Sequence, residues 1–455
     1  MTAQPRALLH TIGCRLNQSE TALLATALEG QGYRLVSFGE PTELLVLNTC
    51  SVTDSAEADC RYAIRRTLRQ SPHAFVAVTG CYAQTGTQSL RRMAGVDLVV
   101  GTQYKMRLPD YLPPAAELRK QSDPVLLHTR RIHREEFVLP GVGAYTSKRA
   151  NLKIQDGCDF MCSFCIIPFA RGHERSREPD DVLREAHELI NRGHRELVLT
   201  GVNIGRYHAG RVNLLGLIRR LEDIPALERI RISSIEPTTI ADDLLEHMAG
   251  SPKLCRHLHV PLQSGDDGIL EAMHRRYRVD DYRSFIEKVL ALMPDIGIGT
   301  DVMVGFPGEG SEQFENTTRL LSELPFAYFH VFSFSKRPGT AAVRMPNDVR
   351  VSTTKNRSRL LAGLSKIKRS AFYQRHIGRT VRVLFETQDE HGFWTGLTQQ
   401  FMRVGVRSAA ELTNECHDIL ITGTMGGLAF GEIVPSEKAR GTGLASNLES
   451  RVGVL

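Results

Sequence analysis

The sequence predicts an α/β protein with three domains: an N-terminal Rossmann-like α/β domain, a central partial (β/α)6 barrel similar to a TIM barrel, and a small C-terminal all-β barrel. Apolar strand patterns alternate with amphipathic helical patterns from residue 7 to about residue 110, and again from residue 151. This alternation is typical of parallel sheets covered by helices. After residue 378 the pattern changes to short β-branched or aromatic runs separated by turn residues. At 455 residues the chain is also longer than a single hydrophobic core usually supports.

Three cysteines mark the predicted N-terminal sheet. Cys14, Cys50 and Cys81 each lie within two residues of the end of one of its first three predicted strands. The carboxyl ends of parallel strands share one edge of a sheet, so these cysteines are expected to converge on one site. One such cysteine is more simply a buried apolar residue, but three in succession favour a shared site. The predicted strands are 7–13, 44–48, 74–80 and 96–100, and the predicted helices are 19–31 and 54–70.

The central domain is predicted over residues 144–375, after an N-terminal domain of residues 1–110 and a proline-punctuated linker of residues 111–143. Six strand patterns, each followed by a longer segment with helical patterns, suit a curved and partly closed barrel. The predicted strands are 152–155, 196–200, 230–234, 257–260, 298–304 and 328–332, with helices that include 179–192, 213–222 and 312–323.

The C-terminal domain is predicted over residues 376–440, with strands at 381–386, 392–397 and 401–406. Small β-barrels of this size often bind nucleic acids. Trp394 and Phe401 are candidates for base stacking, but core packing is the more common role for such side chains. Residues 441–455 are predicted to form a loose tail.

Another three cysteines lie close together after the first barrel strand. Cys158, Cys162 and Cys165 are separated by three and then two residues. Grouped thiolates select zinc, copper or iron–sulfur clusters. A four-iron cluster normally takes four cysteines, so three leave one iron open to a small molecule. The alternative is a tetrahedral zinc site, for which His173 would be the fourth ligand.

Composition narrows the class of protein. Hydrophobic residues make up 42% of the chain and charged residues 24%, which is typical of globular proteins. The sequence lacks an apolar run long enough for a membrane span and a secretory signal, so no membrane partner and a cytoplasmic location are predicted. Residues 349–375 contain eight Lys or Arg and no Asp or Glu. This segment predicts either a solvated helix face or a contact with a polyanion such as RNA.

The spacing of Cys158, Cys162 and Cys165 resembles the signature of the radical S-adenosylmethionine (SAM) superfamily. The segments 13–20, 48–53 and 80–84 around the other cysteines resemble the N-terminal domain of methylthiotransferases. The C-terminal β module resembles a TRAM domain, so the resemblance spans nearly the whole chain.

The resemblance implies SAM and two [4Fe-4S] clusters as cofactors. In such enzymes one cluster binds SAM and cleaves it to methionine and a 5′-deoxyadenosyl radical, a step that belongs to the cofactor. The loop of Cys158, Cys162 and Cys165 would hold this catalytic cluster. An auxiliary cluster that carries the transferred sulfur would take the remaining metal ligands, Cys14, Cys50 and Cys81. Residues at the ends of the second, third and fourth barrel strands would contact SAM: Gly201, Asn203, Glu236 and Gln263. Hydrogen bonding to neighbouring loops is the alternative role for the last two.

The resemblance also implies substrate and partners. Segments 199–207, 231–237 and 335–340 resemble the subgroup that acts on threonylcarbamoyladenosine at position 37 of the tRNA anticodon loop. The same chemistry on isopentenyladenosine, or on an aspartate of a ribosomal protein, is the nearest alternative. A different class of alternative is an RNA-binding protein with structural or redox-sensing clusters. The electron donor would be a flavodoxin or a ferredoxin.

Arginines are the candidates for RNA contacts, because a guanidinium group suits phosphate and stacks on bases. One set lies on the predicted helix 54–70 and another flanks the loop of Cys158. Three cysteines outside the two triads are predicted to be structural: Cys60, Cys255 and Cys416. The arginine candidates are Arg61, Arg65, Arg66, Arg69, Arg171, Arg175 and Arg177.

Overall fold

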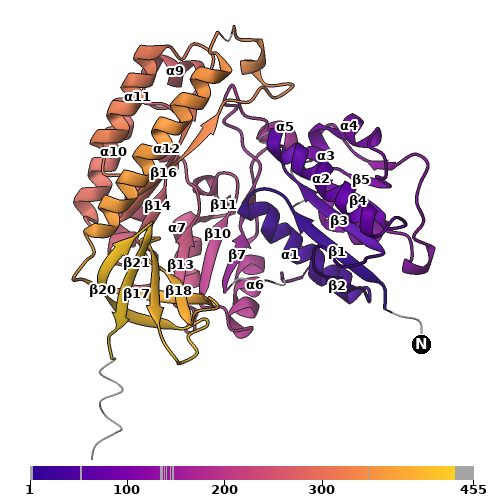
Figure 1. The fold of residues 1–455 in the computed structure, drawn as a ribbon, viewed down its shortest axis with the longest axis horizontal. Coiled ribbons are helices and arrows are strands. Elements are labelled where there is room, and N and C mark those ends of the chain that lie inside the picture. Colours follow the sequence, from indigo (N-terminus) through magenta and orange to yellow (C-terminus); the bar gives the residue numbers. More distant parts are fainter. Residues whose placement is uncertain are drawn as a thin grey trace, which may run out of the picture. The chain divides into compact units, whose positions relative to one another are not determined.

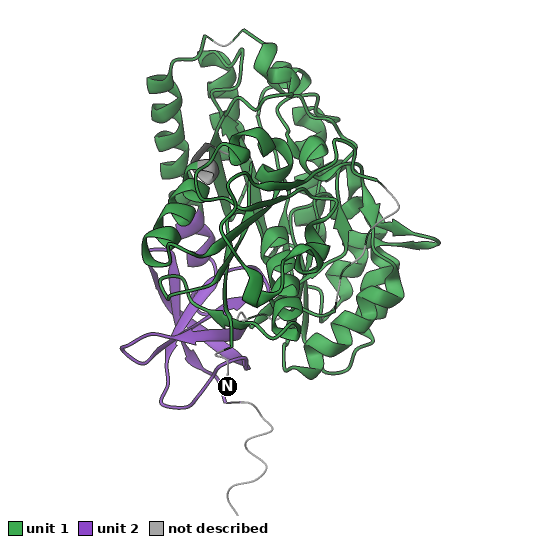
Figure 2. Ribbon diagram, turned by 90° about the vertical axis from the view of Figure 1, so that its right-hand side faces the viewer, with its two compact units in different colours: residues 1–368 green, residues 369–455 purple. Residues whose placement is uncertain are grey.

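The computed structural model describes residues 4–435, except 52–53, 134–136, 138, 140, 144, 146–147 and 347. The chain divides into two compact units, residues 1–368 and residues 369–455 (Figure 2). The tail predicted at 441–455, part of the predicted linker, and Val52 and Thr53 of the second cysteine segment lie outside the described residues. None of the described helices is long and apolar enough to cross a membrane.

The N-terminal part of the first unit is a six-stranded parallel sheet with helices packed against it (Figure 1). Its strand order is β2-β1-β3-β4-β5-β6, and the two central strands β3 and β4 are buried along their whole length. The strands are β1 Arg6–Thr11, β2 Arg34–Val36, β3 Leu44–Thr49, β4 Phe75–Gly80, β5 Leu98–Val100 and β6 Val125–Leu127. The helices are α1 Arg15–Gly30, α2 Asp54–Gln70, α3 Cys81–Thr85 and α4 Thr87–Arg91, with short 3-10 turns at η1 Lys105–Tyr111 and η2 Ala115–Glu117.

The predicted parallel α/β arrangement is confirmed, and the structure adds two strands to it. β2 and β6 are the edge strands of the sheet, with three residues each and partly exposed side chains. A run this short carries no alternation that a sequence pattern can detect. β6 lies within the segment predicted as a linker and pairs in parallel with β5, so the sheet extends beyond residue 110.

The central part of the first unit is a curved array of six parallel strands, as predicted. β13-β10-β7 and β14-β15-β16 form two three-stranded sheets, which meet through parallel bridges between Ile230 and Leu254 and between Ser234 and His259. The strands are β7 Arg149–Lys153, β10 Glu196–Thr200, β13 Arg229–Ile232, β14 His257–His259, β15 Gly297–Val304 and β16 Tyr328–Ser333.

Helices between these strands bury the outward-facing apolar residues. On β10, Leu197 and Leu199 belong to the large core that also contains residues of the helices α6 and α7. Side chains alternate along a strand, so Glu196 and Thr200 face the inside of the curve. The helices are α5 Ile167–Arg171, α6 Pro179–Asn191, α7 Leu214–Glu222, α8 Asp242–Gly250, α9 Asp267–Ala272, α10 Val279–Leu292, α11 Ser311–Glu323 and α12 Val351–Gln374. Short elements lie in the connections: β8 Gln155–Asp156, β9 Arg175–Ser176, β11 His208–Ala209, β12 Val212–Asn213, η3 Ile204–Arg206, η4 Pro237–Thr239 and η5 Ala341–Arg344.

The second unit contains the predicted all-β barrel, closed in the order β17-β18-β19-β21-β20. Trp394 is only 3% exposed, so its ring packs in this barrel and is not available to stack on a base. Phe401 has a φ of 67° and lies between two strands, not in the strand predicted for it. The strands are β17 Thr380–Gln388, β18 Phe393–Thr398, β19 Arg403–Arg407, β20 Cys416–Met425 and β21 Leu428–Ile433.

A buried cluster of ion pairs joins the N-terminal sheet region to the beginning of the barrel. The Glu20 carboxylate on α1 accepts hydrogen bonds from Lys105 at 2.5 Å, Lys153 at 2.7 Å and Arg171 at 2.9 Å. The Asp156 carboxylate accepts from Lys153 at 2.8 Å and from Arg171 at 3.0 Å. These side chains are at most 3% exposed. Burial alone would raise the pKa of Glu20, but Arg171, Lys105 and Lys153 hold it well below its usual value.

Replacing Glu20 should therefore destabilise the first unit strongly. Glu20→Gln leaves the buried Lys105 without its Glu20 carboxylate and leaves Lys153 and Arg171 with Asp156 alone. An uncompensated buried charge typically costs about 3–5 kcal/mol. Urea unfolding followed by circular dichroism measures this loss. The matched control is Glu43→Gln, because the Arg6 and Glu43 side chains of that ion pair are 33% and 44% exposed and exposed ion pairs contribute little stability.

The same comparison has a definite pH dependence. A carboxyl group with a lowered pKa in the folded protein stabilises the fold above its unfolded pKa of about 4.3, and this stabilisation is lost as the pH falls towards the folded pKa. The difference in stability between the wild type and Glu20→Gln should thus shrink below about pH 4. An equal effect of Glu20→Gln and Glu43→Gln at pH 7 would contradict the role of the network.

Candidate active site

The first three predicted cysteines lie at one edge of the N-terminal sheet. Cys14, Cys50 and Cys81 directly follow the ends of β1, β3 and β4 or the turn after them, and these strands are neighbours in the sheet. Cys50 and Cys81 are buried, whereas Cys14 is exposed. The expected convergence on one sheet edge is therefore observed.

Two glycines allow the cysteine turns to pack against each other. Gly13 has a φ of 115°, and a β-carbon on it would lie 2.7 Å from the Cys50 Cβ. Gly80 has a φ of 97°, and a β-carbon on it would lie 2.4 Å from the carbonyl oxygen of Thr49. Both positions combine left-handed backbone with a contact that leaves no room for a side chain. The turns that carry Cys14, Cys50 and Cys81 thus depend on glycine.

Side-chain amides fasten these turns to each other. Asn17 donates to the carbonyl oxygens of Ile12 at 2.9 Å and Thr49 at 3.0 Å. Asn48 donates to the carbonyl oxygen of Asn17 at 2.9 Å, and Arg171 donates to the Asn17 Oδ1 at 2.6 Å. Both asparagines are at most 1% exposed. They hold the loop after β1 against the end of β3 and connect it to the helix that follows the second cysteine loop.

The second group, Cys158, Cys162 and Cys165, lies in the loop between β8 and α5. The amide of Cys158 donates to the Gly172 carbonyl at 3.1 Å, and the amide of Cys165 donates to the Cys162 carbonyl at 3.0 Å. Burial raises the pKa of Cys158 to about 11 and that of Cys165 to about 12. The Cys158 and Cys165 side chains are therefore thiols at neutral pH, and each releases its proton when it binds a metal.

The surroundings of Cys81 suit an anionic metal centre. Lys105 and Arg171 are buried beside it. Negative charge on the Cys81 sulfur works to raise the pKa of both side chains. Together with Lys153 and Arg175, these two cations outnumber the carboxylates of Glu20 and Asp156 in the buried network. A three-thiolate iron–sulfur cluster carries net negative charge, so excess positive charge next to Cys81 fits it.

Arg275 is a site residue that the sequence analysis did not find. Its guanidinium group donates to the Cys162 sulfur at 3.2 Å and to the Tyr277 hydroxyl at 3.2 Å, and it forms an ion pair with the Glu236 carboxylate. The Arg275 side chain is 3% exposed. Glu236 thus makes the contact to a neighbouring loop that was the alternative to SAM binding. The pair of arginines before Tyr277 was the available signal, but such pairs are common on protein surfaces.

Gln155 is another residue that the sequence analysis missed. Its Oε1 accepts hydrogen bonds from the amides of Val202 and Asn203, each at 2.8 Å, and its Nε2 donates to the Gly157 carbonyl at 2.8 Å. A β-carbon on Gly201 would lie 2.8 Å from the same Oε1. Gln155 therefore fixes the loop after β10 against the beginning of the Cys158 loop.

Asn203 and Gln263 keep features that suit a ligand. Asn203 is 1% exposed, and its Nδ2 has no hydrogen-bond partner among the described residues. Such a buried donor is costly unless a ligand or water satisfies it. Gln263, four residues after the end of β14, has a φ of 68°, and strained non-glycine residues are frequent at binding sites. The donors and strand-end positions present here fit a small polar cofactor such as SAM.

Several candidates for RNA contacts are wrong. Arg171 and Arg177 are each 1% exposed. Arg177 is paired with Asp181 and Glu185, and Arg175 reaches Asp156. Sequence alone does not reveal that these cations face inward.

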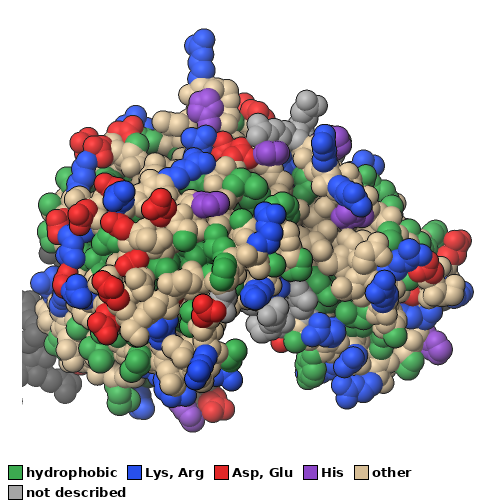
Figure 3. All heavy atoms as spheres, turned by 90° about the horizontal axis from the view of Figure 1, so that it is seen from above, with side chains coloured by type: hydrophobic (Ala, Val, Ile, Leu, Met, Phe, Trp, Pro, Cys, Tyr) green, Lys and Arg blue, Asp and Glu red, His purple; other side chains and the backbone are tan. Residues whose placement is uncertain are grey.

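Arg65, Arg66 and Arg69 on α2 are exposed, as an RNA contact requires. Figure 3 shows Lys and Arg across one face, with Asp and Glu gathered mainly on its left half. The right half, which holds the N-terminal sheet, therefore carries mostly cations. Cys60 and Cys255 are fully buried, which agrees with their predicted structural role.

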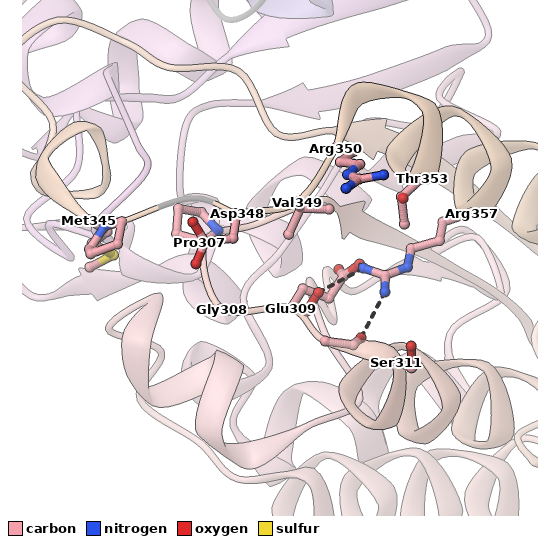
Figure 4. Close-up of a pocket in the computed structure, with 12 residues that line it drawn as sticks. Pro307, Gly308, Glu309, Ser311, Met345, Asp348, Val349, Arg350, Thr353 and Arg357 are labelled. Carbon is pink, nitrogen blue, oxygen red and sulfur yellow. Dashed lines mark hydrogen bonds and ion pairs between the residues drawn. The ribbon is translucent and has the colours of Figure 1, made fainter.

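A hollow lies beside the end of β15, lined by the loop Pro307–Gly310 and the beginning of α12 (Figure 4). It has a volume of about 840 Å³. Arg357 on its wall donates to the carbonyl oxygens of Glu309 at 2.8 Å and Gly310 at 2.9 Å. One of the eight cations of segment 349–375 is thus buried, while Lys355 and Arg359 are exposed.

Comparison with known proteins decides the family. Residues 152–321 match the Radical SAM superfamily, and residues 6–101 match the uncharacterized protein family UPF0004. The threonylcarbamoyladenosine tRNA methylthiotransferase MtaB of Bacillus subtilis (strain 168) is 35% identical over 411 residues, which cover 89% of this chain and 90% of that protein. The chain belongs to the radical SAM methylthiotransferase family.

Other members show how broad this family is. MtaB of Aquifex aeolicus is 36% identical and covers 82% of this chain and 91% of its own length. A tRNA-2-methylthio-N(6)-dimethylallyladenosine synthase of Cereibacter sphaeroides (strain ATCC 17029 / ATH 2.4.9) is 37% identical. The match covers 85% of this chain and 88% of that protein. The methyltransferase TsrM of Kitasatospora setae shares the fold, with a TM-score of 0.52 and 15% identity. The match covers 74% of this chain and 77% of that chain. Members of this radical SAM methylthiotransferase family use SAM and two [4Fe-4S] clusters, so the zinc alternative for the cysteine loop is not supported.

The role of Gln155 can be tested by hydrogen exchange. Gln155→Ala leaves the amides of Val202 and Asn203 without their acceptor, and a lost hydrogen bond of about 1–3 kcal/mol corresponds to an exchange about 5- to 150-fold faster. Exchange measured by mass spectrometry on peptides that contain residues 202 and 203 should show this. The exposed Gln121 serves as a control, since Gln121→Ala should leave these peptides unchanged. Equal protection in Gln155→Ala would show that another group holds the loop.

Proposed function

We propose that this protein is a tRNA methylthiotransferase that converts N6-threonylcarbamoyladenosine at position 37 of tRNA to its 2-methylthio derivative. One observation carries the proposal. Two groups of three cysteines lie on the same compact unit, and a buried ion-pair network connects their loops. The relatives reported above include enzymes named for this reaction.

In this proposal each cysteine group holds one cluster with an open iron. Cys158, Cys162 and Cys165 hold the cluster that binds SAM, and Cys14, Cys50 and Cys81 hold the auxiliary cluster. When bound, SAM and the clusters supply the radical and the sulfur that an unactivated C–H bond requires. The chain's own residues position these groups and exclude water, which is where a protein contributes most to such chemistry.

Four residues are proposed to bind SAM: the backbone at Gly201, the Asn203 amide, Glu236 and Gln263. The unsatisfied Asn203 Nδ2 supports this, since it needs an acceptor such as a SAM oxygen. Gln155 holds the Gly201 loop in position. Arg275 orients Glu236 and donates to the Cys162 sulfur, and this donation stabilises negative charge on the ligand sulfur.

The proposal includes a tRNA anticodon loop as the substrate and a flavodoxin or ferredoxin as the electron donor. Exposed arginines on α2 supply cations that suit the phosphate backbone. We also propose a cytoplasmic location and a three-domain division: an N-terminal domain from residue 1 that extends past 110 through β6, a radical SAM domain from 144 to 375, and a TRAM-like domain from 376 to 440.

Modification of isopentenyladenosine is the second candidate function, because relatives named dimethylallyladenosine synthases reach similar identity. Expression in a bacterial host without methylthiotransferases of its own separates the two. Nucleosides from its tRNA, analysed by mass spectrometry, should contain 2-methylthio-N6-threonylcarbamoyladenosine. Cys158→Ala should abolish this product, because the loop loses a proposed ligand.

The control in this experiment is Cys255→Ala, at a buried cysteine outside both triads, which should retain the product. Appearance of the methylthio form of isopentenyladenosine instead would move the protein to the other subgroup. A host tRNA that gains neither nucleoside would contradict the enzyme function.

A further inference from the structure

The inner face of the barrel has a polar patch that the steps above do not use. His259 on β14, Asp301 on β15 and His330 on β16 lie on three neighbouring strands, and Asp301 is directly opposite His330 in the strand register. One ligand atom from each of these side chains lies within 4.8 Å of the others. We call His259, Asp301 and His330 the inner-face triad.

Two buried atoms of the triad face each other. The His259 Nε2 and the Asp301 Oδ1 are buried and lie 3.3 Å apart, as an ion pair when His259 is protonated, and neither atom makes a hydrogen bond within the described part of the chain. The other ring nitrogen of His259 is hydrogen-bonded to the Ser234 hydroxyl at 2.7 Å, so the ring is held with its Nε2 towards Asp301. Buried polar atoms that make no hydrogen bond destabilise the folded state. A polar ligand at this position would recover that energy.

The patch is accessible from the C-terminal ends of the strands, where the cysteine loop also lies. Asp301 is half-buried, while His330 and the next inward residue of β16, Phe332, are exposed. The rings of His330 and His259 are 5.7 Å apart, and Tyr328 packs against both rings. The triad is therefore a firmly held surface that a group entering the barrel mouth can reach.

Positive charge gathers further along the same inner face. Arg231 donates to Glu196 at 2.7 Å, and Arg229 lies 3.7 Å from the same carboxylate. Arg15 and Arg149 are also within electrostatic range of Glu196. Arg231 and Arg229 thus lie beside one buried carboxylate inside the barrel, and Arg149 also acts on it. Guanidinium groups gathered in this way can bind a carboxylate through charge-assisted hydrogen bonds.

The two substrate classes of the family differ in the chemistry that this face recognises. A threonylcarbamoyl group carries urea N–H donors, a hydroxyl group and a carboxylate, whereas an isopentenyl group is a hydrocarbon. The former can satisfy His259 and Asp301 and place its carboxylate towards the arginines. The latter forms no hydrogen bond with either atom, and a site built for hydrogen bonds rejects such an analogue strongly.

We propose that the inner-face triad binds the threonylcarbamoyl substituent of nucleotide 37 and sets the preference for it over an isopentenyl group. This inference rests on the proposed function and names the residues that would determine its substrate. Overall similarity does not separate the two substrate classes, since relatives of both kinds are 35–37% identical to this chain.

The test compares two synthetic anticodon stem-loops that are identical except for the N6 substituent of nucleotide 37. The ratio of kcat/KM on the threonylcarbamoyl RNA to that on the isopentenyl RNA is measured for the wild type, Asp301→Asn and His330→Phe. The wild type should strongly prefer the threonylcarbamoyl RNA, and each variant should lower this ratio at least tenfold. His330→Phe keeps an aromatic ring against Tyr328 and removes the polar atoms.

Asp295→Asn is the matched control. It removes the same charge just before β15, at the other end of that strand, where Asp295 pairs with Arg256 at 2.8 Å, and it should leave the ratio unchanged. Iron content and the unfolding midpoint report whether each variant folds. If Asp301→Asn does not fold, the His330→Phe variant alone provides the test, because His330 is exposed.

The outcomes separate the inference from the proposed function. An unchanged ratio in folded variants, or an equal loss on both RNAs, would overturn the inference while the wild-type activity on the threonylcarbamoyl RNA stands. A wild type that prefers the isopentenyl RNA would overturn the proposed function itself. One equivalent of a divalent metal other than iron, present in the wild type and lost in His330→Phe, would assign the triad to a cation and overturn the substituent role.

Discussion

The arrangement of the active site depends on the two buried carboxylates of Glu20 and Asp156. Glu20 is six residues after Cys14, and Asp156 is two residues before Cys158. Arg171 and Lys153 bind both carboxylates, so the helix after the first cysteine and the loop of the second group are held by shared charges. Buried ion pairs contribute little net stability, but they define geometry where both partners are fixed. Here they fix the positions of the two cysteine groups relative to each other.

Glycine and amide side chains refine this geometry on both sides. Gly13 and Gly80 bring the sheet-edge turns into contact, while Gln155 fastens the loop after β10 to the Cys158 loop. Most of these contacts join residues more than thirty positions apart. A pair of loops built this way can hold two redox-active groups and a small cofactor with little freedom, which is the condition for directing a radical to a single carbon atom.

The sequence was sufficient for the fold class and for the position of all six cysteines, because strand alternation and strand-end cysteines are local patterns. It was not sufficient to predict which side chains face inward. Arg171 and Arg177 looked like RNA contacts and are buried in ion pairs. Arg275 carries no local signal, since its partners Cys162 and Glu236 are 113 and 39 positions away. The short edge strands β2 and β6 have too few residues for a pattern. Long-range pairing and burial are thus the features that required the structure.

The central claim is that the two cysteine groups hold two separate clusters. Iron content per chain after anaerobic reconstitution tests it most directly, with two four-iron clusters giving about eight irons in the wild type. Cys14→Ala and Cys158→Ala should each lower this value to about four, because each removes a ligand of a different cluster. A wild type with about four irons, and no change in Cys14→Ala, would contradict the account.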